Sequence, residues 1–540
     1  MLTILSWTQK CYTIKFCFVG IYVFFLAGCS QKQQKTTMPN IIYILADDLG
    51  YGDVSSYNPD GKIQTPNIDK IAAEGMRFTD AHTTSSVCTP TRYGILTGRY
   101  NWRSTLKEGV LWGLSEALIS THRTTVASLL GEHGYHTAFI GKWHLGWNWS
   151  FKKSDFTNGE GDKLDFQDID YTRPITHSPN DLGFDYAYGH PASLDMPPYV
   201  YVENEMVTQP PDTITVDKGK FSWWRKGPTG ADFVHEEVTP QFFRKSMEYI
   251  RQRANKTRPF FLYLPLPSPH TPVLPTPEWK GKSDLIPYAD FVMMIDDYTG
   301  QLMEVIEKTG IKENTLVFFT SDNGCSPAAG IDTMQTLGHY SSYIYRGHKA
   351  DIYEGGHRVP FIVRWPAQIS SGTISNQTVC TTDLLATCAQ IVNATLKDNE
   401  GEDSYSMVPL FRQGLARERF REATVHHSIN GSFAIRKGSW KLIMCPGSGG
   451  WSFPRPDNKA VSDTLPKYQL YHLTNDPGET NNLYTLYPDT VRIMKKLLSG
   501  YIMEGRSTPG QPQQNEGNFE NWPQVGFIEK FQKLRENDLH

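Results

Sequence analysis

Oxygen-bearing side chains end two apolar segments of this chain. Asp47 and Asp48 close one segment, and Asp322 and Asn323 follow another far along the sequence. Carboxylate and amide oxygens are ligands for a hard cation, and an amide among carboxylates favours Ca²⁺ over Zn²⁺. Each pair taken alone is more often a helix cap or a turn. The four residues therefore predict a calcium site only if the fold brings the two segment ends together.

Cys88 precedes Thr89 and Pro90, a sequence typical of a helix start. A helix beginning at Pro90 would direct its free amides and the positive end of its dipole at the cysteine, which makes an anion-binding position. Arg92, one turn further on, adds a fixed positive charge. The position suits a thiolate or an oxyanion attached to residue 88. A packed thiol, a metal ligand and a disulfide partner are the alternatives.

Basic side chains end two more apolar runs. Lys142 and His144 follow the run at 136–140, and His270 follows the run at 260–264. Taken singly, a lysine is usually a solvated surface amine and a histidine usually a structural one. Short continuous apolar runs suit strands that are covered on both faces. These side chains are thus predicted to leave the ends of buried strands.

Helical patterns lie between the strand-like runs, at residues 66–74, 124–130, 241–253 and 289–308. Alternating strands and helices predict an α/β fold with a large, mostly parallel sheet flanked by helices. Ligands of such sheets collect at the carboxyl ends of the strands, which is where the polar side chains above fall. Their convergence on one sheet edge is stronger evidence than any single motif.

Two further regions differ in composition from this alternating part. Residues 150–235 show little periodicity and predict long loops over the site. From about residue 415, short alternating strands predict a smaller antiparallel unit. We therefore expect a catalytic domain at 39–415 and a C-terminal subdomain at 416–540.

The N-terminus has the pattern of an export signal. In residues 1–29, two lysines precede an apolar run that is too short to span a bilayer. The sequence LAGC, which ends at Cys29, resembles a bacterial lipobox and implies cleavage before this cysteine and a lipid anchor on its thiol. Residues 30–38 would be a polar tether. We expect an exported lipoprotein of the periplasm or cell surface, with a plain cleaved signal as the alternative.

Charge and cysteine content exclude other classes. The chain has 53 Lys and Arg against 57 Asp and Glu, a net charge of −4, which does not suggest a nucleic-acid partner. The absence of a Cys-x-x-Cys pair argues against a zinc or iron–sulfur site. One disulfide would suit an exported protein, and free buried thiols are the alternative. The candidate cysteines are Cys325, Cys380, Cys388 and Cys445.

The motifs resemble, in order, those of one enzyme family. Residues 88–99, CTPTRYGILTGR, are similar to the signature at which type I sulfatases oxidise the cysteine to Cα-formylglycine. The sequences ADDLG, GKWHLG, SPHTP and TSDNG, and Lys349 with the later EGGHRVP, also match. Cys-x-Pro-x-Arg alone would be weak, but chance does not produce the ordered set. The resemblance implies an alkaline-phosphatase-like fold, sulfuric ester hydrolysis, one Ca²⁺ and a sulfatase-maturating enzyme as partner.

The resemblance also implies the attack on sulfur. A hydroxyl of hydrated formylglycine at position 88 would be the nucleophile, made reactive by the cation and by an Asp at the position of Asp322. His270 would protonate the leaving sugar oxygen. Lys142 and Lys349 would neutralise the sulfate oxygens as charge spreads in the transition state.

The second half of the implied cycle releases sulfate. His144 would take the proton of the remaining hydroxyl, which expels sulfate and restores the aldehyde, and Arg92 would hold residue 88 in place. A thiol could not complete the cycle, because its adduct has no second hydroxyl. The implied metal set is Asp47, Asp48, Cys88 as formylglycine, Asp322 and Asn323.

Segments around the motifs, such as 110–113 and 193–198, resemble bacterial carbohydrate sulfatases related to N-acetylgalactosamine-6-sulfatase. This implies an exo-acting enzyme for 6-O-sulfated galactose or N-acetylgalactosamine in chondroitin-type or algal galactan chains. His190, Asp195 and His427 are candidate contacts to sugar hydroxyls, since a carboxylate or an imidazole can bind vicinal hydroxyls. Hydrogen bonds that stabilise loops are their alternative role.

Two alternatives remain beside this function, and two others conflict with the sequence. A formylglycine-dependent phosphonate or phosphate monoester hydrolase would use the same fold, and a sulfatase could act on another sugar position. An alkaline-phosphatase-type enzyme would need a Ser or Thr nucleophile and ligands for a second metal, which the set lacks. A glycan-binding lipoprotein without catalysis would show gaps among the key residues, and the sequence has none.

Overall fold

The computed structural model describes residues 38–153, 165–411, 420–517 and 522–528. The predicted signal, the lipobox and nearly all of the tether lie outside these residues. Within the described ranges, no helix is both long and apolar enough to cross a membrane.

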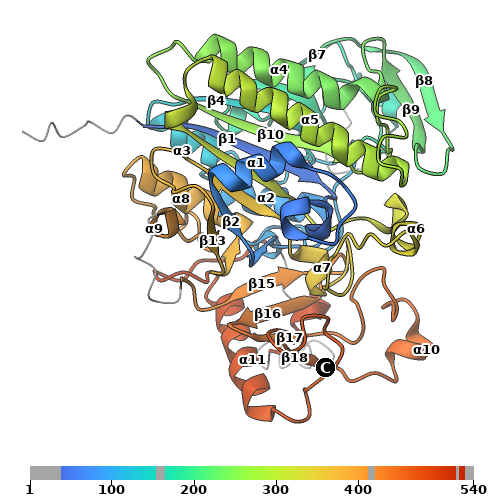
Figure 1. The fold of residues 1–540 in the computed structure, drawn as a ribbon, viewed down its shortest axis with the longest axis vertical. Coiled ribbons are helices and arrows are strands. Elements are labelled where there is room, and N and C mark those ends of the chain that lie inside the picture. The colour runs from blue at the N-terminus through green and yellow to red at the C-terminus, as the bar shows by residue number, and fades with distance from the viewer. Residues whose placement is uncertain (1–37, 154–164, 412–419, 518–521, 529–540) are drawn as a thin grey trace, which may run out of the picture. The chain divides into compact units, whose positions relative to one another are not determined.

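The described residues form a ten-stranded mixed sheet, in the order β13-β2-β12-β11-β1-β10-β4-β5-β6-β7 (Figure 1). Strand β1 pairs in parallel with β10 and β11, and β4 pairs in parallel with β10 and β5. The large, mostly parallel sheet predicted from the sequence is confirmed. The strands are β1 (Asn40–Asp47), β2 (Met76–Phe78), β4 (His136–Lys142), β5 (Tyr186–His190), β6 (Val202–Glu203), β7 (Met206–Val207), β10 (Phe260–Pro269), β11 (Thr315–Ser321), β12 (Phe361–Arg364) and β13 (Thr373–Ser375).

Strand β1 shows why a continuous apolar run becomes a central strand. Tyr43 and Leu45 belong to the core on one face of the sheet, and Ile42 and Ile44 to the core on the other. Successive side chains of a strand point to opposite faces, so both faces need apolar residues. Helices cover both of these cores.

Helices α1, α4 and α5 supply one core, and α2, α3 and α8 supply the other (Figure 1). The helices are α1 (Pro66–Glu74), α2 (Cys88–Thr97), α3 (Val126–Glu132), α4 (Val238–Arg253), α5 (Pro287–Lys308), α6 (Ile331–Thr336), α7 (Glu354–His357), α8 (Leu384–Ile391), α9 (Val408–Phe411), α10 (Lys459–Ser462) and α11 (Pro488–Met503).

Residues 150–235 contain more regular structure than predicted. Strand β5 extends the main sheet, and β8 (Pro211–Asp217) pairs with β9 (Trp224–Gly230) in a separate antiparallel hairpin. The prediction of loops was wrong for these segments. Their strands are short, or largely exposed as in β8, so they lack the apolar pattern from which strands are predicted.

The C-terminal part forms a four-stranded antiparallel sheet, which confirms the predicted smaller antiparallel sheet. Its strands are β15 (Thr424–His427), β16 (Phe433–Lys437), β17 (Trp440–Ile443) and β18 (Gln469–His472). A small fourth sheet pairs β3 (Ala81–His82) with β14 (Val379–Cys380). The expected boundary at residue 415 falls outside the described residues.

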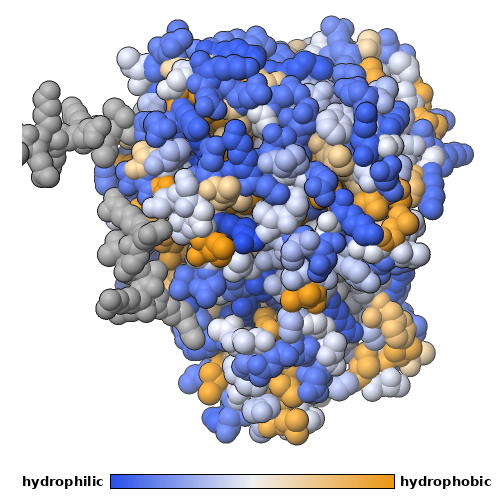
Figure 2. Space-filling view, in the orientation of Figure 1, coloured by the Kyte–Doolittle hydropathy of each residue, from blue (hydrophilic) through white to orange (hydrophobic). Residues whose placement is uncertain are grey.

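All five cysteines in the described ranges are buried and free. The alternative of free thiols therefore holds over the disulfide for these residues. On the face drawn in Figure 2, apolar residues lie in small groups among hydrophilic ones.

Candidate active site

The two oxygen-bearing segment ends meet at one edge of the sheet. Asp47 closes β1, and Asp322 follows the neighbouring strand β11. Asp48 has a left-handed backbone, with φ of 65°, and its amide donates to Asp322 Oδ1 at 3.2 Å. Asn323 Nδ2 donates to Asp48 Oδ1 at 2.7 Å. The juxtaposition on which the calcium prediction depended is therefore present.

Several oxygens at this edge are oriented as ligands would be. Asp47 Oδ1 and Asn323 Oδ1 are buried, and no described residue donates a hydrogen bond to either. Asp47, Cys88 and Asp322 hold their ligand atoms within 4.8 Å of one another. Buried acceptors without donors are costly in the absence of a cation. The donor set fits one hard divalent ion such as Ca²⁺.

Helix α2 begins at Cys88, two residues before the predicted start at Pro90. The backbone carbonyl of Val87 accepts from the amide of Thr91, so Cys88 already belongs to the first turn. Proline is tolerated there because first-turn amides have no partner within the helix. With this earlier start, the buried Cys88 side chain still lies at the positive end of the helix dipole.

Two buried lysines approach the carboxylates. Lys142 Nζ, at the end of β4, lies 2.5 Å from Asp47 Oδ2 and 2.9 Å from Ser193 Oγ. Lys349 Nζ lies 2.8 Å from Asp48. Burial acts to raise the pKa of Asp47, but the charges of Lys142 and its neighbours outweigh burial and hold this pKa well below its usual range. The lysines thus point at the centre of the site.

Arg92 joins the ends of β11 and β4. Its Nε and Nη2 donate to Asp322 Oδ2 at 3.0 and 2.7 Å, and Nη1 donates to the carbonyl of Lys142 at 2.9 Å. Burial and the charge of Asp47 raise the pKa of Asp322 to about 7, against the opposing charge of Arg92. The guanidinium is fully buried, so it is a fixed part of the site.

Two histidines, His144 and His270, lie near the carboxylates and lysines of the site. His144 has φ of 56°, and its Nε2 pairs with the carbonyl of Leu111 at 2.8 Å, which leaves Nδ1 as an unprotonated acceptor. Burial and the charge of Lys142 hold the pKa of His144 well below its usual value. His270 Nε2 lies 3.7 Å from Asp48 Oδ2. Burial lowers the pKa of His270 as well.

The three candidate sugar contacts lie in different surroundings. His190 ends β5 opposite Lys142, and its buried ring stacks on Phe242. His427 lies on β15 with its buried ring against Phe433. Asp195 lies two residues after Ser193, whose hydroxyl contacts Lys142 and His270. Of the three, Asp195 carries an ion pair with a solvent-exposed partner.

The partner of Asp195 is Arg225, which sequence reasoning missed. Arg225 lies on β9, two residues after Trp223, and its guanidinium lies over the rings of Trp223 and Trp112. These residues come from three separate segments, so no local spacing links them. Ser193 was missed too, although it opens the segment that the sequence comparison had singled out.

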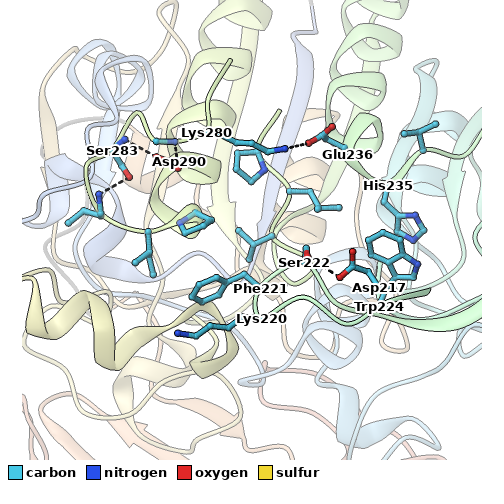
Figure 3. Close-up of a pocket in the computed structure, with 18 of the residues that line it drawn as sticks. Asp217, Lys220, Phe221, Ser222, Trp224, His235, Glu236, Lys280, Ser283 and Asp290 are labelled. Atoms are coloured by element: carbon cyan, nitrogen blue, oxygen red, sulfur yellow. Dashed lines mark hydrogen bonds and ion pairs between the residues drawn. The ribbon is translucent and has the colours of Figure 1, made fainter. Parts of the chain in front are cut away.

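A separate cavity of about 970 Å³ lies between the β8–β9 hairpin and residues 273–290 (Figure 3). Trp224 and His235 line one side, with their rings stacked at 3.9 Å. None of the predicted catalytic or metal-binding residues lines this cavity. The cavity is therefore separate from the predicted catalytic and metal-binding residues.

A second cluster of histidines is structural. Nitrogens of His82, His357 and His426 lie within 4.8 Å of one another, and the rings of His357 and His426 stack 4.0 Å apart. His357 Nε2 pairs with Lys441 Nζ at 2.9 Å, and its Nδ1 pairs with His82 Nδ1 at 3.1 Å. Because these nitrogens already have partners, the cluster fits a buried polar network between α7 and the C-terminal sheet better than a metal site.

The chain belongs to the sulfatase family, whose model, named Sulfatase, matches residues 39–394. It hydrolyses sulfuric esters. It is 34% identical over 519 residues to an N-acetylgalactosamine-6-O-sulfatase of Bacteroides thetaiotaomicron, covering 88% of this chain and 96% of that protein. Human arylsulfatase A is 31% identical, with 85% and 87% of the two chains covered.

Solved structures agree with the fold. A Bacteroides thetaiotaomicron sulfatase structure, described under the metabolism of multiple glycosaminoglycans, matches with a TM-score of 0.72 and 32% identity. The match covers 86% of this chain and 99% of that one. The predicted alkaline-phosphatase-like sulfatase fold is confirmed.

Proposed function

We propose that this sulfatase removes the 6-O-sulfate of galactose or N-acetylgalactosamine from a glycan, with residue 88 matured to Cα-formylglycine beside one Ca²⁺. The observation that carries the chemistry is the position of Cys88, at the start of α2 among Asp47, Asp322 and the buried lysines. The similarity to an N-acetylgalactosamine-6-O-sulfatase over 88% of the chain supports the sugar.

The chain's own residues would then share the work as follows. Once matured and loaded, the site supplies a hydrated aldehyde as nucleophile and a cation that stabilises negative charge. Asp47, Asp48, Asp322 and Asn323 would hold the cation. Lys142 and Lys349, which pair with Asp47 and Asp48 here, would bind sulfate oxygens once these carboxylates hold a cation.

The histidines fit opposite proton transfers. In its doubly protonated form, His270 would donate a proton from Nε2 to the leaving sugar oxygen, because an alkoxide is a poor leaving group. His144 Nδ1, which is buried and without a donor among the described residues, would accept the proton that accompanies sulfate release. Arg92 would keep Asp322 and the end of β4 in register with residue 88.

The test is sulfate release by matured protein from three sugars: N-acetylgalactosamine 6-sulfate, galactose 6-sulfate and N-acetylglucosamine 6-sulfate. We expect release from one or both galacto sugars and none from the Cys88→Ala variant. Release from the gluco sugar alone would overturn the sugar assignment. An unaltered rate in Cys88→Ala would overturn the mechanism. A phosphonate monoester in the same assay tests the alternative hydrolase.

We also propose that the protein is exported and anchored through lipid on Cys29, with residues 39–415 and 416–540 as catalytic domain and C-terminal subdomain. A maturating enzyme must act on Cys88 before the chain is active. Radiolabelled palmitate should enter the wild-type protein and not Cys29→Ala. Label in neither protein would favour the plain cleaved signal.

A further inference from the structure

Four residues beside the catalytic centre have no part in the roles above. Trp112, Asp195, Trp223 and Arg225 form what we call the Arg225 cluster. The Arg225 guanidinium lies over both indole rings, 5.0 Å from the centroid of Trp112 and 5.1 Å from that of Trp223. Two indole faces therefore hold one planar cation in place.

Asp195 fixes one edge of this cation. Arg225 Nη1 pairs with Asp195 Oδ2 and donates to the Asp195 carbonyl at 3.1 Å, and the Arg225 amide donates to the same carbonyl at 3.3 Å. Asp195 itself is only 4% exposed. Its second carboxylate oxygen, Oδ1, is buried and receives no hydrogen bond from any described residue. That oxygen is an acceptor that lacks a donor.

The opposite edge of Arg225 is open. Its Nε and Nη2 donate to no residue in the described ranges, and 42% of the side chain is exposed. The Trp112 side is open as well, with 51% of this residue exposed. A guanidinium with two free, parallel N–H donors is suited to bind a carboxylate or a sulfate through a forked pair of hydrogen bonds.

The Arg225 cluster adjoins the catalytic side chains at two points. Ser193, two residues before Asp195, contacts Lys142 Nζ at 2.9 Å and the His270 ring at 3.4 Å. On the other side, His144 pairs with the carbonyl of Leu111, the residue before Trp112. A sugar whose sulfate reaches the lysines would therefore have its ring, or the next sugar, against the cluster.

The hairpin presents two different faces. Trp224 lines the cavity of Figure 3, whereas its neighbour Arg225 does not line it. Side chains that follow one another on a strand alternate between its two sides. Arg225 is thus directed away from that cavity, toward Asp195.

We propose that Arg225 binds a second anionic group of the glycan, either the carboxylate of an adjacent uronic acid or a second sulfate ester. Asp195 orients Arg225 and accepts a hydrogen bond from a sugar hydroxyl through Oδ1, and Trp112 packs against a sugar ring. The natural substrate is then a glycan with more than one anionic group. This inference rests on the proposed function.

The experiment compares matured wild type, Arg225→Met, Arg225→Lys and Lys226→Met. Lys226 is the matched control, because it is an exposed cation at the next position of the same strand. The substrates are N-acetylgalactosamine 6-sulfate, the same sugar linked to glucuronic acid, and N-acetylgalactosamine 4,6-disulfate.

We expect Arg225→Met to raise KM about tenfold on one of the two more anionic substrates, with kcat little changed. On the monosulfated sugar its kcat/KM should stay within about twofold of wild type. Arg225→Lys should be intermediate, and Lys226→Met should resemble wild type. The affected substrate identifies the group as carboxylate or sulfate.

Equal loss on all three substrates would overturn the inference, because it would show a structural role. No loss on any substrate would overturn it too. In both cases wild-type release from the monosulfated sugar would leave the proposed function standing. No wild-type release from any of the three or from galactose 6-sulfate would refute the proposed function, and this inference with it.

Discussion

At the scale of single residues, Arg92 connects more of the site than any sequence pattern indicated. Its Nε and Nη2 donate to Asp322, and its Nη1 donates to the carbonyl of Lys142. Breaking a buried ion pair leaves an unpaired charge, which typically costs about 3–5 kcal/mol. The consequence of substituting Arg92 should therefore reach both stability and activity.

We predict that Arg92→Lys lowers kcat by about a hundredfold and destabilises the fold by roughly 2 kcal/mol, because a lysine keeps the charge and loses the fork. Steady-state kinetics and urea unfolding measure the two effects. The exposed Arg492 offers the control Arg492→Lys, which should change neither. A fully active Arg92→Lys would show that the fork does not position the site.

The second prediction at the scale of residues concerns Asp47 and Asn323. Their orphaned oxygens should bind Ca²⁺ in the folded state only, so chelation with EGTA should lower the melting temperature and abolish sulfate release. At free Ca²⁺ about a hundred times the Kd, the stabilisation is roughly 2.7 kcal/mol. Titration calorimetry on Asn323→Leu should show weakened binding. Unchanged melting after chelation would contradict a cation at this site.

At the scale of elements, Gly141 allows close contact between β4 and β10 immediately before Lys142. Its φ of 148° is rarely adopted by other residues, and a Cβ there would lie 2.0 Å from the carbonyl oxygen of Pro265 on β10. That oxygen belongs to a neighbouring strand and cannot move alone. The glycine therefore allows β4 and β10 to approach each other just before Lys142.

We predict that Gly141→Ala destabilises the protein by about 3 kcal/mol and reduces activity at least as strongly as it reduces the folded fraction. Gly500→Ala is the matched control: it lies within α11, has open space around its Cβ, and should gain about 0.5–1 kcal/mol. Thermal unfolding compares the two. Equal stability of both variants would refute the steric explanation.

The same elements show what sequence could and could not predict. The strands that end at Asp47, Lys142 and Asp322 were predictable, because strands buried on both faces must be continuously apolar. The start of α2 was predicted two residues late, since proline tolerates several first-turn positions. The hairpin with Arg225 was missed because exposed strands carry no apolar pattern, and its contact with Asp195 arises only in the folded chain.

At the scale of the whole molecule, buried ionisable groups join α7 to the C-terminal sheet. Lys441 Nζ on β17 lies 3.1 Å from Glu354 and 2.9 Å from Glu479. Burial lowers the pKa of His357 and of His426 well below the usual value, and burial raises the pKa of Glu479 to about 7. This network makes stability depend on pH.

The sign follows from proton binding. Three histidines have lowered pKa values in the folded chain: His82, His357 and His426. Below about pH 6.5 the unfolded chain therefore binds protons that the folded chain does not, and the protein becomes less stable as the pH falls. Each contributes at most about 1.4 kcal/mol per pH unit, where the unfolded side chain is protonated and the folded one is not. Glu479, with its raised pKa, opposes one of them between about pH 4.3 and 7.

We therefore predict a net loss of roughly 3 kcal/mol per pH unit from this network below about pH 6, measured by urea unfolding between pH 7.5 and 5.5. His426→Gln should reduce the slope by about 1.4 kcal/mol per pH unit, whatever it does to stability itself. The exposed His122 supplies the control, since His122→Gln should leave the slope unchanged. An identical slope in His426→Gln would contradict neutral burial.

The state of Cys88 decides the proposed mechanism most directly. Mass spectrometry of the tryptic peptide from Phe78 to Arg92, taken from protein that releases sulfate, should show the thiol sulfur replaced by a carbonyl oxygen. The same peptide should react with an aminooxy probe. Fully active protein whose Cys88 is an intact thiol, alkylated quantitatively after unfolding, would contradict the mechanism.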